Sequence, residues 1–157
     1  MQSTDKTPSA TIKAYLAAFA LCLFASALPA AEPSAEGLWK TINEKTNKPD
    51  SIVRIVETNG EFSGRIEKIF VEPGGVPAPK CDQCEGKFKN QPILGMTFLW
   101  GFKREGNKYT GGQILDPDEG QVYHCRMELS ADGTRLEVRG YVGIPLFGRT
   151  QTWFREP

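Results

Sequence analysis

The chain has 157 residues, and its 19 basic and 19 acidic side chains give a formal net charge of zero. This balance excludes a typical nucleic-acid-binding protein, which needs a basic face against phosphates, and a polybasic protein of membrane surfaces. A single histidine argues against histidine metal sites and Ser-His-acid triads. We therefore predict a protein that is not an enzyme and that uses no metal or cofactor.

The first thirty residues have the pattern of a secretory signal peptide. A polar, lysine-containing segment precedes an uncharged apolar run over residues 14–27, and small residues follow it. Cleavage after Ala27 or Ala30 fits this pattern, and the apolar run is shorter than the about 20 residues of a membrane-spanning helix. We expect a periplasmic or secreted protein with a signal peptide over residues 1–30 and a single mature domain over residues 31–157.

The mature sequence predicts β-strands and almost no helix, because short β-rich segments are separated by turn residues. Dipeptides such as Asn59-Gly60 and Asp132-Gly133 supply the positive φ that tight hairpins require. The predicted strands are residues 38–42, 51–57, 61–70, 96–103, 108–115, 121–130, 134–142 and 149–155. Eight antiparallel strands joined in chain order close most naturally into an all-β up-and-down barrel, which leaves no edge strand exposed.

Alternation of apolar and polar residues gives each predicted strand one apolar face. A barrel of about eight strands holds either packed side chains or one small ligand, and the sequence leaves both interpretations open. The candidate ligand-binding residues of the interior are Trp39, Phe62, Ile66, Phe98, Trp100, Tyr123 and Met127, with Arg54 and Gln113 as inward polar groups. On the fourth predicted strand, Met96, Phe98, Trp100 and Phe102 are expected to share the inward face.

A Gly37-Leu38-Trp39 sequence enters the first strand, and Arg149 and Arg155 lie near the C-terminus. This combination resembles the pattern of lipocalins and fatty-acid-binding proteins, the calycins. The resemblance implies that Trp39 plugs the closed end of a barrel and that one of the two arginines stacks over its indole, with a cation–π contribution.

A second resemblance covers nearly the whole mature chain. The segments that carry it, in order, are residues 37–42, 51–55, 81–86, 91–95, 111–117 and 139–153, which read GLWKTI, SIVRI, CDQCEG, QPILG, GGQILDP and RGYVGIPLFGRTQTW. They resemble the uncharacterised secreted proteins of the bacterial domain-of-unknown-function 2147 family. This resemblance implies a small exported lipocalin-like barrel and no known catalytic residues.

Three cysteines remain after removal of the signal peptide: Cys81, Cys84 and Cys125. Exported proteins usually oxidise their thiols, and an odd number leaves one cysteine unpaired or shared between two molecules. Four interpretations stay open: a local Cys81–Cys84 disulfide, a long-range bridge to Cys125, a zinc knuckle, and a redox-active Cys-x-x-Cys pair. His124 cannot easily join Cys125 in a zinc site, since neighbours on a strand point to opposite faces.

Two apolar turns, residues 92–97 and 145–150, run from a proline to a glycine and lead into a strand. In a barrel whose strands follow chain order, both turns lie at the mouth, opposite Trp39. Loops are normally polar, so Leu94 and Phe147 need an explanation. They either fold inward as corks, or form a portal for an apolar ligand or a docking patch.

The leading hypothesis is an exported lipocalin-like protein that binds a small apolar or amphipathic molecule. The alternatives are an envelope structural or interaction protein with a filled barrel, and a thiol–disulfide protein that uses Cys81 and Cys84. We expect a small hydrophobic ligand as the partner, no nucleic acid and no stable membrane insertion, and we make no prediction of oligomeric state.

Overall fold

In a computed structural model, the chain is described at residues 1–2 and 32–157. The predicted signal peptide therefore falls almost wholly on residues outside the described part. The elements are β1 (Gly37–Asn43), β2 (Lys48–Thr58), β3 (Glu61–Ile69), η1 (Gly86–Phe88), β4 (Thr97–Glu105), β5 (Lys108–Asp116), β6 (Gln121–Leu129), β7 (Arg135–Tyr141) and β8 (Gly148–Glu156). Within residues 1–2 and 32–157, no helix has the length and apolarity needed to cross a membrane.

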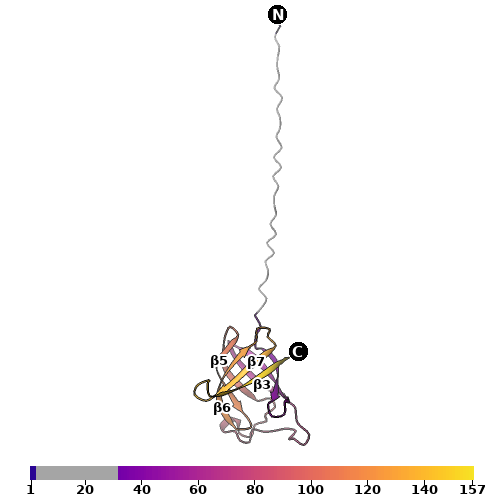
Figure 1. The fold of residues 1–157 in the computed structure, drawn as a ribbon, viewed down its shortest axis with the longest axis vertical. Helices are drawn as coiled ribbons and strands as arrows, with labels where there is room; N and C mark the ends of the chain where they lie inside the picture. The colour runs from indigo at the N-terminus through magenta and orange to yellow at the C-terminus, as the bar shows by residue number, and fades with distance from the viewer. Residues whose placement is uncertain (3–31) are drawn as a thin grey trace. The chain divides into compact units, whose positions relative to one another are not determined.

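The eight strands form one closed antiparallel barrel (Figure 1). Each strand pairs with the next in the chain, and β1 closes the barrel by pairing with β8 through Leu38 and Glu156, Trp39 and Arg155, and Lys40 and Phe154. The predicted all-β, eight-stranded up-and-down fold is confirmed, and each predicted strand differs from the observed one by at most a few residues at its ends.

The interior of the barrel is filled by side chains rather than left as a large hollow. Two inward-facing glycines show how closely side chains of one strand approach the backbone of the next. A Cβ atom at Gly64 would lie 2.8 Å from the Leu99 side chain, and one at Gly112 would overlap the Phe102 ring. Large side chains on β4 thus occupy the space that the glycines of β3 and β5 leave free, as in the dense packing of protein cores.

The alternation predicted for β4 is wrong at Trp100, whereas Met96, Phe98 and Phe102 are buried as predicted. Phe62 pairs with Phe102, and Gly64 pairs with Leu99. Between these two pairs β4 therefore contains one residue more than β3, which is a β-bulge. Gly101 lies in this bulge and has a φ of 83°. A bulge of this kind shifts the inward face along the strand. Leu99 is fully buried in the interior, whereas Trp100 points outward.

The closed end is sealed by Trp39, which is completely buried. Its Nε1 donates a hydrogen bond of 2.7 Å to the carbonyl oxygen of Ala35, and the guanidinium carbon of Arg155 lies 4.3 Å from the indole centroid. Arg155 also donates hydrogen bonds to the carbonyl oxygens of Gly133, Glu36 and Ser34, at 2.6, 2.8 and 2.5 Å.

Of the two arginines that the lipocalin resemblance left open, Arg155 is therefore the stacking residue. Arg149 lies near the other end of β8 and instead forms an ion pair with Glu44, in the connection between β1 and β2.

Candidate functional site

The long connection between β3 and β4, residues 70–96, packs against the outside of the barrel near its open end. Lys80 and Pro92 form an isolated β-bridge, which pairs the two ends of the segment 80–92 and makes it a loop within this connection. The tip of this loop contacts the β5–β6 turn closely: a Cβ atom at Gly120 would overlap the carbonyl group of Gln83. Leu115, at the end of β5 just before this turn, is only 1% exposed.

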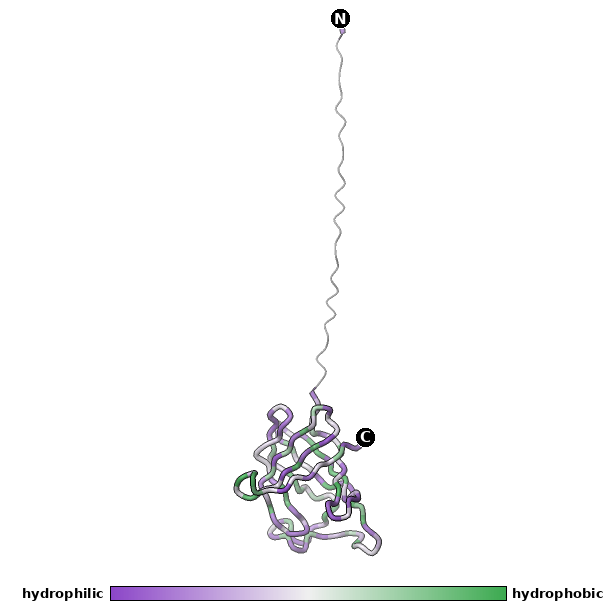
Figure 2. The backbone as a smooth tube through the Cα atoms, in the orientation of Figure 1, coloured by the Kyte–Doolittle hydropathy of each residue, from purple (hydrophilic) through white to green (hydrophobic). Residues whose placement is uncertain are grey.

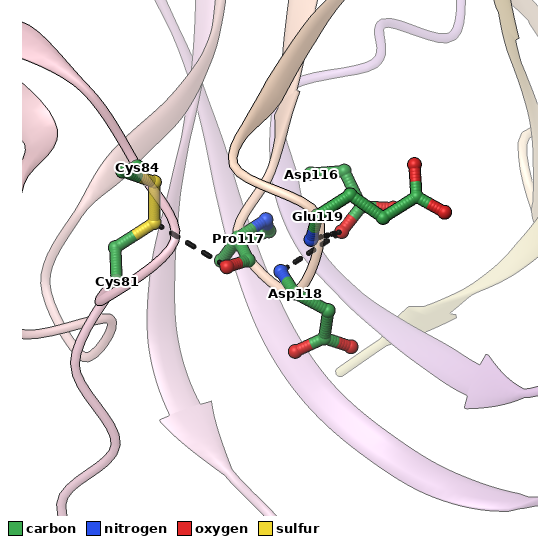
Figure 3. Close-up of a disulfide and its surroundings, with 6 residues drawn as sticks. All are labelled: Cys81, Cys84, Asp116, Pro117, Asp118 and Glu119. Carbon is green, nitrogen blue, oxygen red and sulfur yellow. Dashed lines mark hydrogen bonds between the residues drawn. A yellow bond between two sulfur atoms is a disulfide. The ribbon is translucent and has the colours of Figure 1, made fainter.

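A disulfide between Cys81 and Cys84 fixes the tip of this loop (Figure 3). Both cysteines are at most 1% exposed, and the Sγ atom of Cys81 lies 3.4 Å from the carbonyl oxygen of Pro117. The local bridge is confirmed among the four interpretations of the cysteines. It excludes the long-range bridge to Cys125 and a zinc site that would use both thiolates.

Cys125 is free and lies inside the barrel, opposite Gly112 on β5 and Gly140 on β7. Burial raises the pKa of its thiol to about 12. A thiol of this kind stays protonated near neutral pH, so it behaves as a small apolar side chain rather than a nucleophile.

A groove of about 460 Å³ lies between the loop and the outer surface of β4. The residues that line it are Lys87, Phe88, Gln91, Pro92, Leu94, Gly95, Met96, Thr97 and Trp100. Their side chains are mostly apolar, and Lys87 is the basic residue among them. The groove is open to solvent along one side.

Two aromatic rings form the wall of this groove. Phe88 stacks on Trp100, with ring centroids 5.7 Å apart and an angle of 24° between the planes. The Trp100 Nε1 donates a 3.0 Å hydrogen bond to Gln113 Oε1, which satisfies the polar edge of the indole. The Lys87 ammonium lies 4.9 Å from the Phe88 centroid and 5.9 Å from that of Trp100.

The groove therefore combines a flat apolar surface with a positive charge at the same place. Rings of this kind bind apolar or aromatic groups, and an ammonium group attracts an anion. Lys87 and Phe88 were not among the site residues predicted from the sequence. A Lys-Phe pair in a loop rich in proline and glycine is a local signal that could have indicated them.

The predicted interior residues fall into three groups. Five of them are inside the barrel and at most 7% exposed: Trp39, Phe62, Ile66, Phe98 and Met127. Tyr123 is half-buried at the open end, where its hydroxyl donates a 2.5 Å hydrogen bond to Glu119. This bond raises the pKa of the tyrosine.

Arg54, Trp100 and Gln113 do not point inward, and the prediction that they do is wrong. Val53 and Ile55 are buried on β2, so Arg54 between them points outward, where its Nε lies 2.8 Å from Glu67 Oε1. Hydrogen bonds from Arg54, and then from Arg65, lower the pKa of Glu67. Trp100 and Gln113 are cross-strand partners on the outer surface.

Leu94 and Phe147 are not corks. Leu94 is 54% exposed and Phe147 is 70% exposed, so neither fills the barrel. Leu94 borders the groove beside Trp100, whereas Phe147 belongs to the separate β7–β8 connection. The predicted site residues thus form no single constellation: Trp100, Gln113 and Leu94 lie at or next to the groove, and the others lie in the interior or elsewhere on the surface.

A closed eight-stranded barrel with a tryptophan plug under an arginine is a lipocalin-like structure. A solved structure with this fold, protein HP1028 from the human pathogen Helicobacter pylori, is described as belonging to the lipocalin family. The two share a TM-score of 0.68 and 24% sequence identity over 79% of this chain and 84% of that chain, a likeness of fold alone.

The chain belongs to the DUF2147 family, whose model matches residues 37–155 and is described as an uncharacterized protein conserved in bacteria. No curated protein matches the sequence. The predicted family and the predicted lipocalin-like fold are both confirmed.

Proposed function

We propose that this protein is an exported binding protein, not an enzyme, and that it holds a small amphipathic molecule in the groove beside Trp100. The observation that carries this proposal is the stacked pair of Phe88 and Trp100 with the Lys87 ammonium beside it. Sites for small molecules are typically about 300–1,000 Å³, mostly apolar and equipped with a few polar groups, and the groove of about 460 Å³ matches this description.

The packing of the barrel supports an external site over an internal one. Trp39, Phe62, Phe102 and Tyr109 are each at most 1% exposed and occupy the inner volume toward the closed end. A ligand in that volume would have to displace buried aromatic side chains, which costs several kcal/mol for each ring. A ligand in the groove would displace only water.

The expected ligand has a flat apolar part and a negatively charged group. The flat part would lie against Trp100 and Leu94, and the anion would approach Lys87. The signal-peptide pattern of residues 1–30 supports export. A mature N-terminus at Leu28 or Ala31 in protein recovered from the periplasm, determined by intact mass, tests that part of the proposal.

The binding experiment uses two fluorescent probes of similar shape and different charge. Anilinonaphthalene sulfonate is anionic, and N-phenyl-1-naphthylamine is neutral. Replacing Trp100 by Ala is expected to weaken both probes by about two- to tenfold, because an aromatic pair contributes about 0.5–1.5 kcal/mol beyond area burial. Replacing Lys87 by Gln is expected to weaken only the anionic probe.

The matched control is Phe154→Ala, because Phe154 is 40% exposed and lies on β8, away from the groove lining. This variant should bind both probes normally. Equal affinity in the Trp100→Ala variant would contradict the groove site, and would favour a filled-barrel interaction protein. Native mass spectrometry of periplasmic protein then identifies the mass of a retained natural ligand.

A further inference from the structure

The β7–β8 connection exposes more apolar surface than an ordinary loop. We define the apolar loop as residues 142–147, and Figure 2 shows it as a largely hydrophobic segment projecting at the left of the barrel. The exposed fractions are 64% for Val142, 55% for Ile144, 76% for Leu146 and 70% for Phe147. Between Val142 and Phe147 no side chain carries a polar group.

This exposure is built into the fold, since the apolar loop is held in place by Arg139. The Arg139 Nε donates a 2.7 Å hydrogen bond to the carbonyl oxygen of Pro145, and its Nη2 donates one of 3.3 Å to that of Leu146. Within the loop, the Val142 N–H donates to the Phe147 carbonyl, and the Phe147 N–H donates to that of Ile144, at 3.2 and 3.1 Å.

These hydrogen bonds lower the cost of moving the loop from water into an apolar medium. A polar backbone group that lacks a partner is costly in hydrocarbon. Here six backbone groups of the loop, four carbonyls and two N–H groups, already have partners, and the side chains of the loop are apolar. The loop also projects outward, so a fluid apolar phase can surround it without a preformed pocket.

Two arginines stand directly behind the loop on the outer face of the barrel. Arg126 on β6 and Arg139 on β7 are cross-strand partners. Across residues 32–157, neither forms an ion pair with a carboxylate, whereas the nearby Arg149 is neutralised by Glu44. Like charges placed opposite each other on a sheet are unfavourable, and a bound anion removes that repulsion.

We propose that the apolar loop docks the protein on an anionic lipid surface. Leu146 and Phe147 enter the boundary between headgroups and acyl chains, and Arg126 and Arg139 meet the lipid phosphates. The neutral net charge of the chain does not oppose this contact, because the surface potential of a membrane acts only within about a Debye length. The proposal goes beyond ligand binding at Trp100 and does not rest on it.

The test is flotation of the purified exported protein with lipid vesicles. One preparation contains phosphatidylglycerol and phosphatidylethanolamine in equal parts, and the other contains phosphatidylcholine alone. The unmodified protein is expected to float with the anionic vesicles and to lose binding at high salt. The Leu146→Ser/Phe147→Ser variant should bind at least about tenfold more weakly, since two large apolar side chains no longer enter the lipid.

Arg126 is the arginine to replace, because Arg139 also holds the loop. Arg126→Gln should weaken binding to anionic vesicles about fivefold, in line with about 1 kcal/mol for each basic residue near a charged bilayer. The control is Val71→Ser/Val76→Ser, which alters two exposed apolar side chains in the β3–β4 connection, 43% and 67% exposed. This variant should float like the unmodified protein.

Three outcomes would overturn the proposal. The first is that the unmodified protein binds neither preparation, which would leave the loop as a contact for a protein partner. The second is that the serine variant of the loop binds as well as the unmodified protein while circular dichroism shows both folded. The third is equal loss of binding in the β3–β4 control.

Discussion

The closed end of the barrel and its open end are built from different kinds of contact. At the closed end, Trp39 is fully buried and Arg155 both covers its ring and donates hydrogen bonds to backbone carbonyls. At the open end, Leu94 and Phe147 are more than half exposed, and a disulfide holds the longest loop. Stability is concentrated where burial is deepest, so the other end can carry exposed surfaces for binding.

The strongest test of this comparison is the same substitution at both ends. Trp39→Ala should lower the free energy of unfolding by about 3–5 kcal/mol, because it removes a large buried ring and leaves a cavity under Arg155. Trp100→Ala removes a half-buried ring at the groove and should cost clearly less. Chemical denaturation of both variants measures the difference, and an equal loss at the two positions would break the comparison.

Removing the disulfide sharpens the comparison at the open end. The bridge joins residues only three positions apart, so constraint of the unfolded chain contributes about 2 kcal/mol. We expect Cys81→Ala/Cys84→Ala to lower stability by no more than that and to weaken probe binding in the groove, because the loop tip loses its anchor beside Pro117. Unchanged probe affinity would show that the groove does not depend on the disulfide.

The buried thiol of Cys125 gives a pH test of the barrel interior. Its pKa lies above the ordinary 9.0, at about 12, because of burial. Between these values the unfolded chain loses the proton and the folded chain keeps it, so rising pH favours unfolding.

About one pH unit above 9.0, the cost from this group is on the order of 1 kcal/mol. Cys125→Ala should therefore flatten the alkaline fall in stability while leaving the curve below pH 8 parallel to that of the unmodified protein. Denaturant midpoints across this range check the effect, and identical alkaline slopes for the two proteins would contradict it.

The strands and the closed end were predictable because their signals are local. Alternating residues such as those around Phe62, turn dipeptides such as Asn59-Gly60, and the Gly37-Leu38-Trp39 entry each reflect a short stretch of chain. The choice of Arg155 over Arg149 was not local, since it depends on the pairing of β8 with β1 across the barrel.

The faces of β4 and the groove could not be predicted in the same way. The outward turn of Trp100 follows from a bulge in β4, where Leu99 packs against Gly64 of the neighbouring strand. The groove is made by a long connection without periodicity, whose path is set by contacts of Phe88 and Cys81 with distant residues. Long loops with such roles carry little pattern of their own.

The smallest expected effect on stability comes from charges placed on the two exposed turns. Leu94→Asp and Phe147→Asp should each change the free energy of unfolding by no more than about 0.5 kcal/mol, since surface substitutions lose little burial. Each should instead disturb a different function: Leu94→Asp the binding of the anionic probe, which Lys87 attracts, and Phe147→Asp the binding of anionic vesicles. Probe titration and flotation of both variants form a crossed test. If either variant unfolded, its turn would be part of the core in solution, and the distinction between a sealed end and an exposed end would fail at that residue.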